Sequence, residues 1–181
     1  MSDTLEGGPL AQAVQRRPVG AAYAALLSLV VLAISGSVGL ALKQPWLFPS
    51  LGPTVMLFFQ SPRNAAARPL NTLVGHGVGL IAGILCLLVV GQWGKPSAAT
   101  AGLNPQYLLG GVLSVAITTA VLVLLNLPHP PAGATTLIVS LGILQGAPAL
   151  LSMAGAIVLI TVLGWAADRL LLGRTPKEPN G

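Results

Sequence analysis

The stretch LNLPHPPAGATTLIVSLGILQ (residues 125–145) lies between two apolar runs and combines features that a membrane-buried helix does not tolerate. Prolines and a histidine precede a Gly-Ala-Thr-Thr step. Proline breaks the interior of a helix, and hydrocarbon accepts neither unsatisfied backbone groups nor a titratable ring without a large cost. The stretch therefore indicates a helix that is interrupted for a reason.

The composition around this stretch is typical of a membrane protein. Hydrophobic residues make up 54% of the 181-residue chain, the mean hydropathy is +0.82, and only 7% of residues are charged. A soluble domain has about a quarter of its residues charged, so most of this surface must face a lipid bilayer. The net charge of +5 does not indicate nucleic-acid binding, because the cations lie between apolar runs, where they act as topology signals.

Residue patterns that would support catalysis or a cofactor are not evident. Cys86 lies alone within an apolar run, so we expect neither a disulfide nor a thiolate metal site. The sequence has no histidine and cysteine cluster with zinc spacing, no phosphate-binding loop and no nucleophile elbow. No Asp or Glu lies deep in an apolar run, which disfavours a cation pump. We expect no catalytic residue, no metal, no cofactor and no enzymatic activity.

Four apolar runs are long enough to cross a bilayer, which takes about 20 residues. They are Val19–Leu42, Leu70–Gly91, Tyr107–Leu127 and Ala147–Leu172. Two shorter runs, Ser50–Gln60 and Ala132–Gln145, each begin at prolines and a glycine. These runs predict an all-α polytopic membrane helix bundle of four long spans and two short, broken half-helices.

The two short runs are similar to each other. FPSLGPTVML (residues 48–57) and HPPAGATTLI (residues 129–138) share the spacing Pro-x-x-Gly-x-Thr followed by aliphatic residues. Each copy has one long span before it and one after it, which favours duplication over coincidence. The predicted transmembrane domain (residues 19–172) then consists of two pseudo-symmetric repeats of three segments. The divisions of the chain are a tail (1–18), repeat one (19–91), a linker (92–106), repeat two (107–172) and a second tail (173–181).

The cations distinguish two topologies. If the short runs cross the bilayer, the chain makes six passes, and most cations lie in the cytoplasm: Arg16, Arg17, Arg63, Arg68, Arg169, Arg174 and Lys177. Lys43 and Lys95 then lie outside. If the short runs are re-entrant, the chain makes four passes, Lys95 moves inside, and Arg63 and Arg68 move outside. Both topologies obey the positive-inside rule, but six passes obey it better and would make the repeats inverted. Both tails are expected in the cytoplasm, and the membrane is expected to be a bacterial inner membrane.

Interrupted helices of this kind indicate an anion site. The first N–H groups of a helix lack intrahelical partners and carry about half a positive charge, so a helix start inside a membrane favours an anion. Short segments interrupted by Gly and Pro, at matching places in two halves, point to the binding site of a transporter. The alternative interpretation is that the prolines only end one helix and start the next.

Each candidate substrate-binding residue either lies at a helix interruption or has a polar side chain within an apolar region. They are Ser50, Gly52, Thr54, Asn71, His76, His129, Pro130, Pro131, Gly133, Thr135 and Thr136. Either histidine could donate to an anion or carry a proton, or could instead be a neutral ring bonded to a nearby carbonyl. Asn71 and Asn126 could line the site or cap helices. The spacing of Gly75, Gly79 and Gly83 predicts close helix packing.

The run His129-Pro130-Pro131-Ala132-Gly133-Ala134-Thr135 resembles the signature of the HPP family of integral membrane proteins. The Phe48–Phe58 region and the Arg68–His76 block are similar to two further blocks of that family. Pro69, Asn71, Gly75 and His76 fit the second of these blocks, whereas Arg68, Leu70 and Val74 depart from it, and Pro53 stands where the family usually has alanine. The resemblance implies four spans, and it implies nitrite or another small monovalent anion as cargo, because some plastid and cyanobacterial members are nitrite transporters.

We therefore expect a transporter or channel for a small inorganic anion, with nitrite favoured, bound at the N-termini of two broken helices near the midplane of the membrane. Channel-like and proton-coupled transport both stay open. A homo-oligomer is expected, since a small chain has few helices to shield its broken segments. The alternative is a non-transporting membrane scaffold in which the HPP turn is a packing device. An intramembrane enzyme that uses His129 is a third, less favoured interpretation.

Overall fold

The computed structural model describes residues 9–173, and every regular element in that range is helical, which confirms the predicted all-α fold. Two predicted cytoplasmic cations, Arg174 and Lys177, lie outside the described residues. Four long helices have the length and apolar composition of membrane spans: α2 (Arg17–Leu42), α4 (Pro69–Val89), α6 (Pro105–Leu124) and α8 (Ala147–Leu172). The structure also has three short helical elements: α1 (Pro9–Ala13), η1 (Ala65–Ala67) and α5 (Ala98–Ala101).

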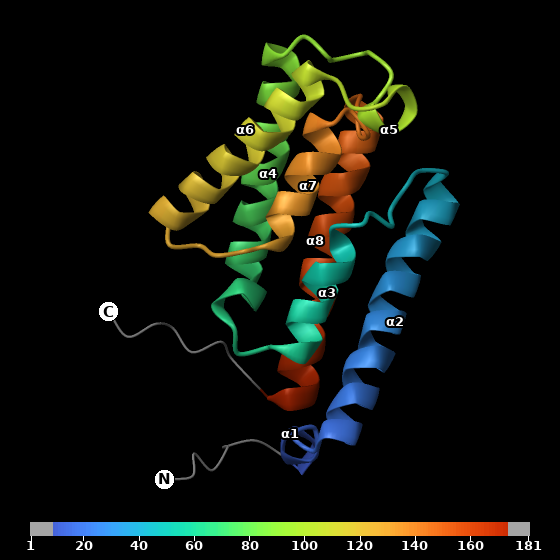
Figure 1. The fold of residues 1–181 in the computed structure, drawn as a ribbon. Coiled ribbons are helices and arrows are strands. Elements are labelled where there is room, and N and C mark those ends of the chain that lie inside the picture. The colour runs from blue at the N-terminus through green and yellow to red at the C-terminus, as the bar shows by residue number, and fades with distance from the viewer. Residues whose placement is uncertain (1–8, 174–181) are drawn as a thin grey trace.

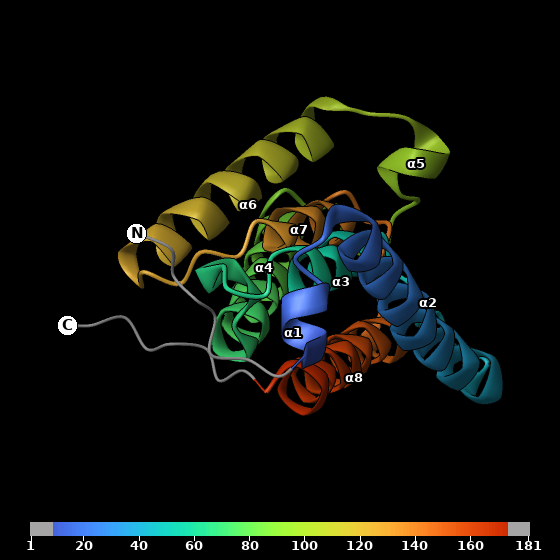
Figure 2. The same ribbon diagram turned by 90° about the horizontal axis from the view of Figure 1, so that it is seen from below.

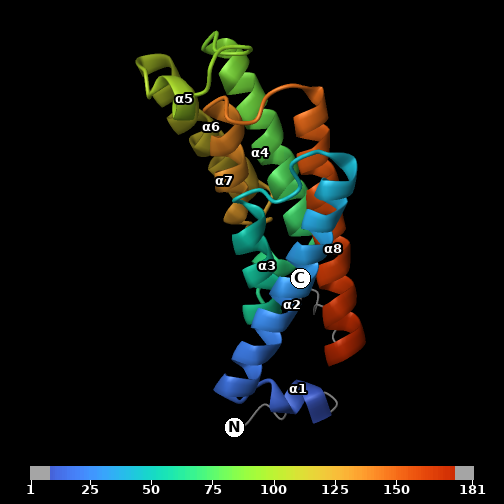
Figure 3. The same ribbon diagram turned by 90° about the vertical axis from the view of Figure 1, so that its right-hand side faces the viewer.

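The two remaining helices are the predicted half-helices. They are α3 (Leu51–Gln60) and α7 (Pro131–Ser140), with ten residues each. Ten residues extend about 15 Å, which is half of the roughly 30 Å hydrocarbon core of a bilayer. Figure 3 shows α7 above α3, and both helices begin at the middle height of the molecule.

The second half of the chain runs in the opposite direction to the first. Helix α2 ascends, α3 descends from the middle and α4 ascends, whereas α6 descends, α7 ascends from the middle and α8 descends (Figure 1). These directions are the ones that an inverted repeat requires. The duplication itself stays a prediction.

Helices α3, α4 and α7 form the centre of the bundle when the molecule is seen from below, with α2 and α6 on opposite sides of it and α8 along a third side (Figure 2). Helix α3 packs against α2 and α8, whereas α7 packs against α4 and α6. The apolar core between α3 and α8 includes Val55, Phe58, Met153 and Ile157, all buried. Each half-helix is therefore held by two long helices.

The chain between α2 and α3 re-enters the bundle in extended form. Helix α2 ends at Leu42 and is capped by Lys43, whose φ of 52° is left-handed, and the Gln44 N–H donates to the carbonyl of Gly39. The returning segment then lies along α2, where the Ser35 hydroxyl donates to the carbonyl of Trp46 at 2.7 Å. Side-chain and backbone partners of this kind are what irregular backbone needs at membrane depth.

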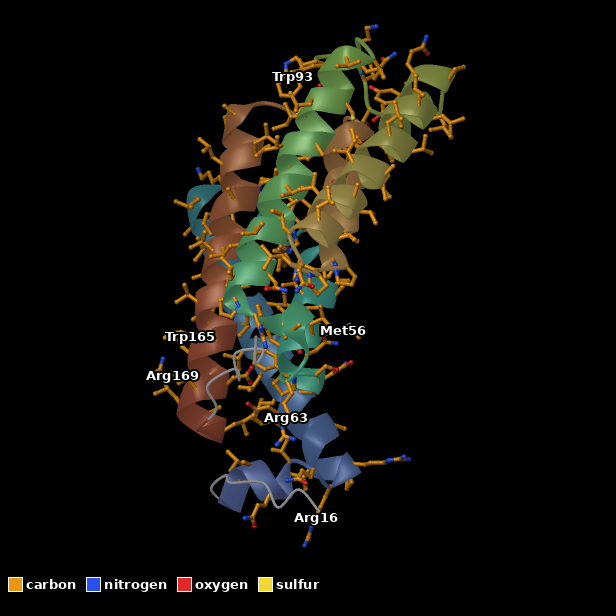
Figure 4. The ribbon with its side chains drawn as sticks, turned by 90° about the vertical axis from the view of Figure 1, so that its left-hand side faces the viewer. Arg16, Met56, Arg63, Trp93, Trp165 and Arg169 are labelled. Atoms are coloured by element: carbon orange, nitrogen blue, oxygen red, sulfur yellow. The ribbon has the colours of Figure 1, made fainter. Side chains whose placement is uncertain are left out.

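The charged residues at the lower end agree with the sidedness of the six-pass topology. Figure 4 shows Arg16, Arg63 and Arg169 at one end of the molecule and Trp93 at the other. A four-pass topology would have placed Arg63 at the end opposite to Arg16. The connection between α6 and α7 differs from a full crossing, because it lies at middle height and not at the lower end (Figure 1). Which end faces the cytoplasm stays a prediction.

This arrangement makes a prediction for cysteine labelling in intact bacterial cells. In a Cys86→Ala background, Lys95→Cys should react with a membrane-impermeant maleimide from outside, whereas Arg63→Cys should react only after the cells are permeabilised. The reason is that residues 61–68 and the connection that contains Lys95 lie at opposite ends of the bundle. Labelling of Arg63→Cys in intact cells would instead contradict the predicted cytoplasmic position of the loop after α3.

Candidate functional site

Polar residues from both half-helices converge on one histidine of α4. Thr54 Oγ1 of α3 lies 2.9 Å from His76 Nε2, and Thr135 Oγ1 of α7 lies 2.7 Å from His76 Nδ1. All three side chains are completely buried. His76 therefore joins the beginnings of α3 and α7 through its two ring nitrogens.

The second histidine extends this cluster toward the loop after α3. His129 Nε2 lies 3.1 Å from His76 Nε2, and the two rings are edge to face with centroids 4.7 Å apart. His129 Nδ1 lies 2.8 Å from the carbonyl oxygen of Ala66 in η1. We call Thr54, His76, His129 and Thr135 the histidine–threonine cluster.

Two asparagines hold the backbone segments that frame the cluster. Asn64 caps η1, since its side chain accepts from the Ala66 N–H at 2.9 Å. Asn71 donates from Nδ2 to the carbonyl of Pro128 at 3.1 Å, which fixes the turn before His129 against α4. Asn71, one of the predicted site residues, thus positions the HPP turn. The other candidate, Asn126, is exposed in a left-handed conformation at the end of α6.

The glycines of α4 let α7 approach closely. A Cβ atom added to Gly75 would lie 2.7 Å from Cβ of His129, and one added to Gly79 would lie 2.8 Å from the carbonyl oxygen of Ala132. A Cβ added to Gly83 would lie 2.8 Å from Cβ of Val139. The predicted close packing through these glycines is confirmed, and Gly75 in particular leaves room for the His129 side chain.

Several predicted residues lie near the cluster without belonging to it. Thr136 bonds to Thr118 of α6 at 3.0 Å and donates to the Ala132 carbonyl, and Ser50 contributes its carbonyl as acceptor for the Thr54 hydroxyl. Pro131 is buried at the start of α7, and Pro130 is exposed.

Gly52 and Gly133 face away from the histidines. Each lies two residues before the threonine on its own half-helix, which is about 200° around the helix axis. A Cβ atom added to either glycine would meet no heavy atom within 4 Å. The structure therefore does not bring these glycines together with the cluster.

Two backbone N–H groups at the start of α7 are bonded within the HPP turn, whereas the sequence predicted unpaired groups there. Pro130 and Pro131 have no N–H, and the N–H groups of Ala132 and Gly133 donate to the carbonyls of His129 and Pro130 at 3.0 and 3.1 Å. At the start of α3, the Leu51 N–H donates to the Phe48 carbonyl at 2.9 Å. Neither Ala132 nor Gly133 therefore offers a free backbone donor to a ligand, while the helix dipole persists.

The sequence predicted a polar hollow between the half-helices, but side chains fill this space. Contacts of 2.7 to 3.1 Å among the cluster atoms leave no room for an ion between them. A hollow of about 730 Å³ lies instead at the lower end, where Tyr23, Phe59, Arg63 and Asn64 are among the residues that line it.

Sequence reasoning missed two partners of the site. Thr118 is a polar residue within the α6 run, at the position that faces Thr136, and its hydroxyl was the available signal. The carbonyl of Ala66 gave no signal, because any residue there would carry the same oxygen.

The fold and this cluster define a polytopic membrane protein whose two interrupted helices meet at a buried histidine pair. The family model described as "HPP, transmembrane region" matches residues 12–176, so the chain belongs to the HPP transmembrane family. The family and the four apolar helices together suggest a membrane transporter or channel. The comparisons with curated proteins and with solved structures found no match.

Two glycine substitutions on α4 test the close packing at the site. Gly75→Ala should destabilise the protein by about 1–3 kcal/mol, the usual cost of an overpacked core, because the new methyl group would collide with the near end of the His129 side chain. Gly77→Ala is the matched control, since its Cβ would meet no atom within 4 Å. Thermal unfolding in detergent measures both, and equal melting temperatures would contradict the packing.

Proposed function

We propose that this chain is a transporter or channel for a small monovalent anion, with nitrite as the favoured cargo. One observation carries the proposal: the buried His76 side chain is hydrogen-bonded to a threonine of each half-helix. The positive ends of both helix dipoles therefore point toward the same buried region, which is how broken-helix transporters hold anionic groups. Nitrite is favoured because of the resemblance to nitrite transporters.

The proposed ligands are the side chains of the histidine–threonine cluster. Hydroxyl and ring N–H groups are suitable donors for the oxygen atoms of nitrite. Because these groups bond to each other in the structure, an anion can bind only in a second conformation, in which it replaces a histidine–threonine bond. Separation of His76 from Thr54 or Thr135 would part α4 from one of the half-helices.

The hollow at the lower end supports approach of an anion from that side. Arg63 and Asn64 line it, and a cation at the mouth of a pathway raises the local concentration of anions. Asn64 also caps η1, whose Ala66 carbonyl is bonded to His129. The loop after α3 thus connects this hollow to the cluster.

A non-transporting scaffold is the second candidate, and the tight packing of the cluster favours it. Every cluster side chain has a partner within hydrogen-bond distance, as a purely structural polar network requires. We propose no enzymatic role.

Nitrite uptake into proteoliposomes separates the two candidates. At neutral pH, where nitrous acid is already a very small fraction, native protein should take up nitrite faster than protein-free liposomes. His129→Ala and Thr135→Val should abolish this uptake, because each removes a proposed ligand. Thr161→Val is the matched control: it deletes a buried hydroxyl that bonds only to the Ile157 carbonyl within α8. Uptake no faster than in protein-free liposomes would support the scaffold.

We also propose that the chain forms a homo-oligomer through the face that α3 and α7 present together. Pro53, Met56 and Leu137 are exposed on this face, and Figure 4 shows Met56 pointing away from α8. The neighbouring α6–α7 connection exposes Asn126 at middle height. Irregular backbone is unstable against lipid, so this face needs a protein cover, and a second copy of the chain supplies the same broken face.

Light scattering after size-exclusion chromatography in detergent tests this face. Gly133→Leu should reduce the assembly to a smaller species while the melting temperature of the fold is retained, because the new side chain projects into open space. The control Gly77→Leu lies on the opposite side of α4 from α7 and should leave the assembly unchanged. A monomeric native protein would contradict the proposal.

A further inference from the structure

The bonding pattern fixes where the protons of the histidine–threonine cluster lie. A carbonyl oxygen can only accept, so His129 Nδ1 carries a proton toward Ala66. In a neutral His129, Nε2 is then an acceptor, and His76 Nε2, 3.1 Å away, must be the donor. His76 Nδ1 is therefore an acceptor and receives the hydroxyl proton of Thr135.

Thr54 completes this pattern. Its hydroxyl donates to the Ser50 carbonyl at 2.9 Å, and its oxygen can share the His76 Nε2 proton with His129. The opposite tautomer of His76 is excluded for a neutral pair, because two unprotonated Nε2 atoms would face each other at 3.1 Å. In the neutral cluster, every ring and hydroxyl proton thus has an acceptor, and no donor is left for an anion.

The neutral cluster can take up one proton at two places. The proton can bind His129 Nε2, and the His76 Nε2 proton must then turn away from His129. Alternatively, the proton can bind His76 Nδ1, and Thr135 Oγ1 then becomes the acceptor of that hydrogen bond. Either way the histidine pair becomes singly positive. In either case, a hydrogen-bond donor changes its partner at the contact of His76 with Thr54 or Thr135, the threonines of the two half-helices.

The elements packed around the pair provide no counter-ion. Within the described residues, α3, α7 and η1 contain no ionisable side chain, and α6 contains only Tyr107, which bonds to the Pro96 carbonyl. Helix α4 carries Arg68 at its N-cap, eight residues before His76, and Cys86. Helix α8 has Asp168 and Arg169 near its lower end, and Asp168 accepts from Tyr23. A buried charge without a partner is strongly disfavoured.

We propose that the histidine pair binds one proton together with each anion, so that the transported unit is an anion and a proton with no net charge. This inference rests on the proposed anion transport and names its coupling. The neutral pair offers an anion neither charge nor a free donor, and the protonated pair lacks a counter-ion. The proton therefore provides the charge and the donor that the anion needs, and the anion provides the counter-ion that the protonated pair lacks. His76 and His129 form the proton site. Their hydrogen bonds to Thr54 and Thr135 change when the proton binds, and this change acts on the two half-helices.

The pH dependence of nitrite binding to the native protein in detergent tests the coupling. If one proton binds with each anion, the dissociation constant of nitrite should rise about tenfold for each pH unit above the pH at which the free histidine pair takes up its proton. Calorimetry in two buffers with different ionisation enthalpies should give close to one proton taken up per nitrite bound. Nitrite itself stays an anion over this range, so the proton must be held by the protein.

The outcomes separate the coupling from the proposed function. Nitrite binding or uptake that is independent of pH, with no proton taken up, would overturn the coupling and leave anion transport in place. Neither binding nor uptake at any pH would overturn both. His129→Gln and His76→Gln, which can form hydrogen bonds but hold no proton, should weaken nitrite binding and abolish its dependence on pH. Thr161→Val should keep the native slope, and a native slope in both glutamine variants would also overturn the coupling.

Discussion

Hydrocarbon offers no hydrogen-bond partner to a broken helix, and this constraint shapes the whole molecule. Two of the six apolar segments begin at middle height, so the polar groups at their starts must be bonded within the protein. The HPP turn does this in three ways. Prolines remove donors, the first N–H groups turn back onto nearby carbonyls, and Asn71 binds the carbonyl of Pro128. The remaining polarity lies in side chains.

His76 is the point at which the two half-helices depend on each other. Its ring nitrogens bond to Thr54 of α3 and Thr135 of α7, and its neighbour His129 bonds to the loop that follows α3. Close packing of α7 on the α4 glycines makes these contacts possible, since any side chain at Gly75 would displace His129. A change at one ring nitrogen would thus reach both halves of the chain. This linkage joins the proposed proton site to the proposed movement of α3 and α7.

The absence of acidic side chains near the histidine pair, within the described residues, gives the cluster its chemical character. Carboxylates near a histidine pair would hold a proton there permanently and would repel an anion. Without them, the pair is bonded only to neutral groups, as the proposed joint binding of a proton and an anion requires. The outward face of α3 and α7 has the complementary character: it is apolar, partly exposed and free of close neighbours at Gly52 and Gly133. The half-helices therefore have an inner polar side and an outer apolar side.

The sequence by itself determined the membrane class, the four spans, the two half-helices and the glycine packing of α4. It also singled out His76 and His129 as candidate site residues. These depend on composition, run length and local spacing, which are properties of neighbouring residues. Only the tertiary structure decided that His76 and His129 touch, that Thr136 pairs with Thr118 and that Gly52 and Gly133 face outward. It also decided that the expected hollow is filled and that the Ala132 and Gly133 N–H groups are bonded within the HPP turn. The physical reason is that a hydrogen bond between distant segments depends on helix rotation and depth, which no local pattern encodes.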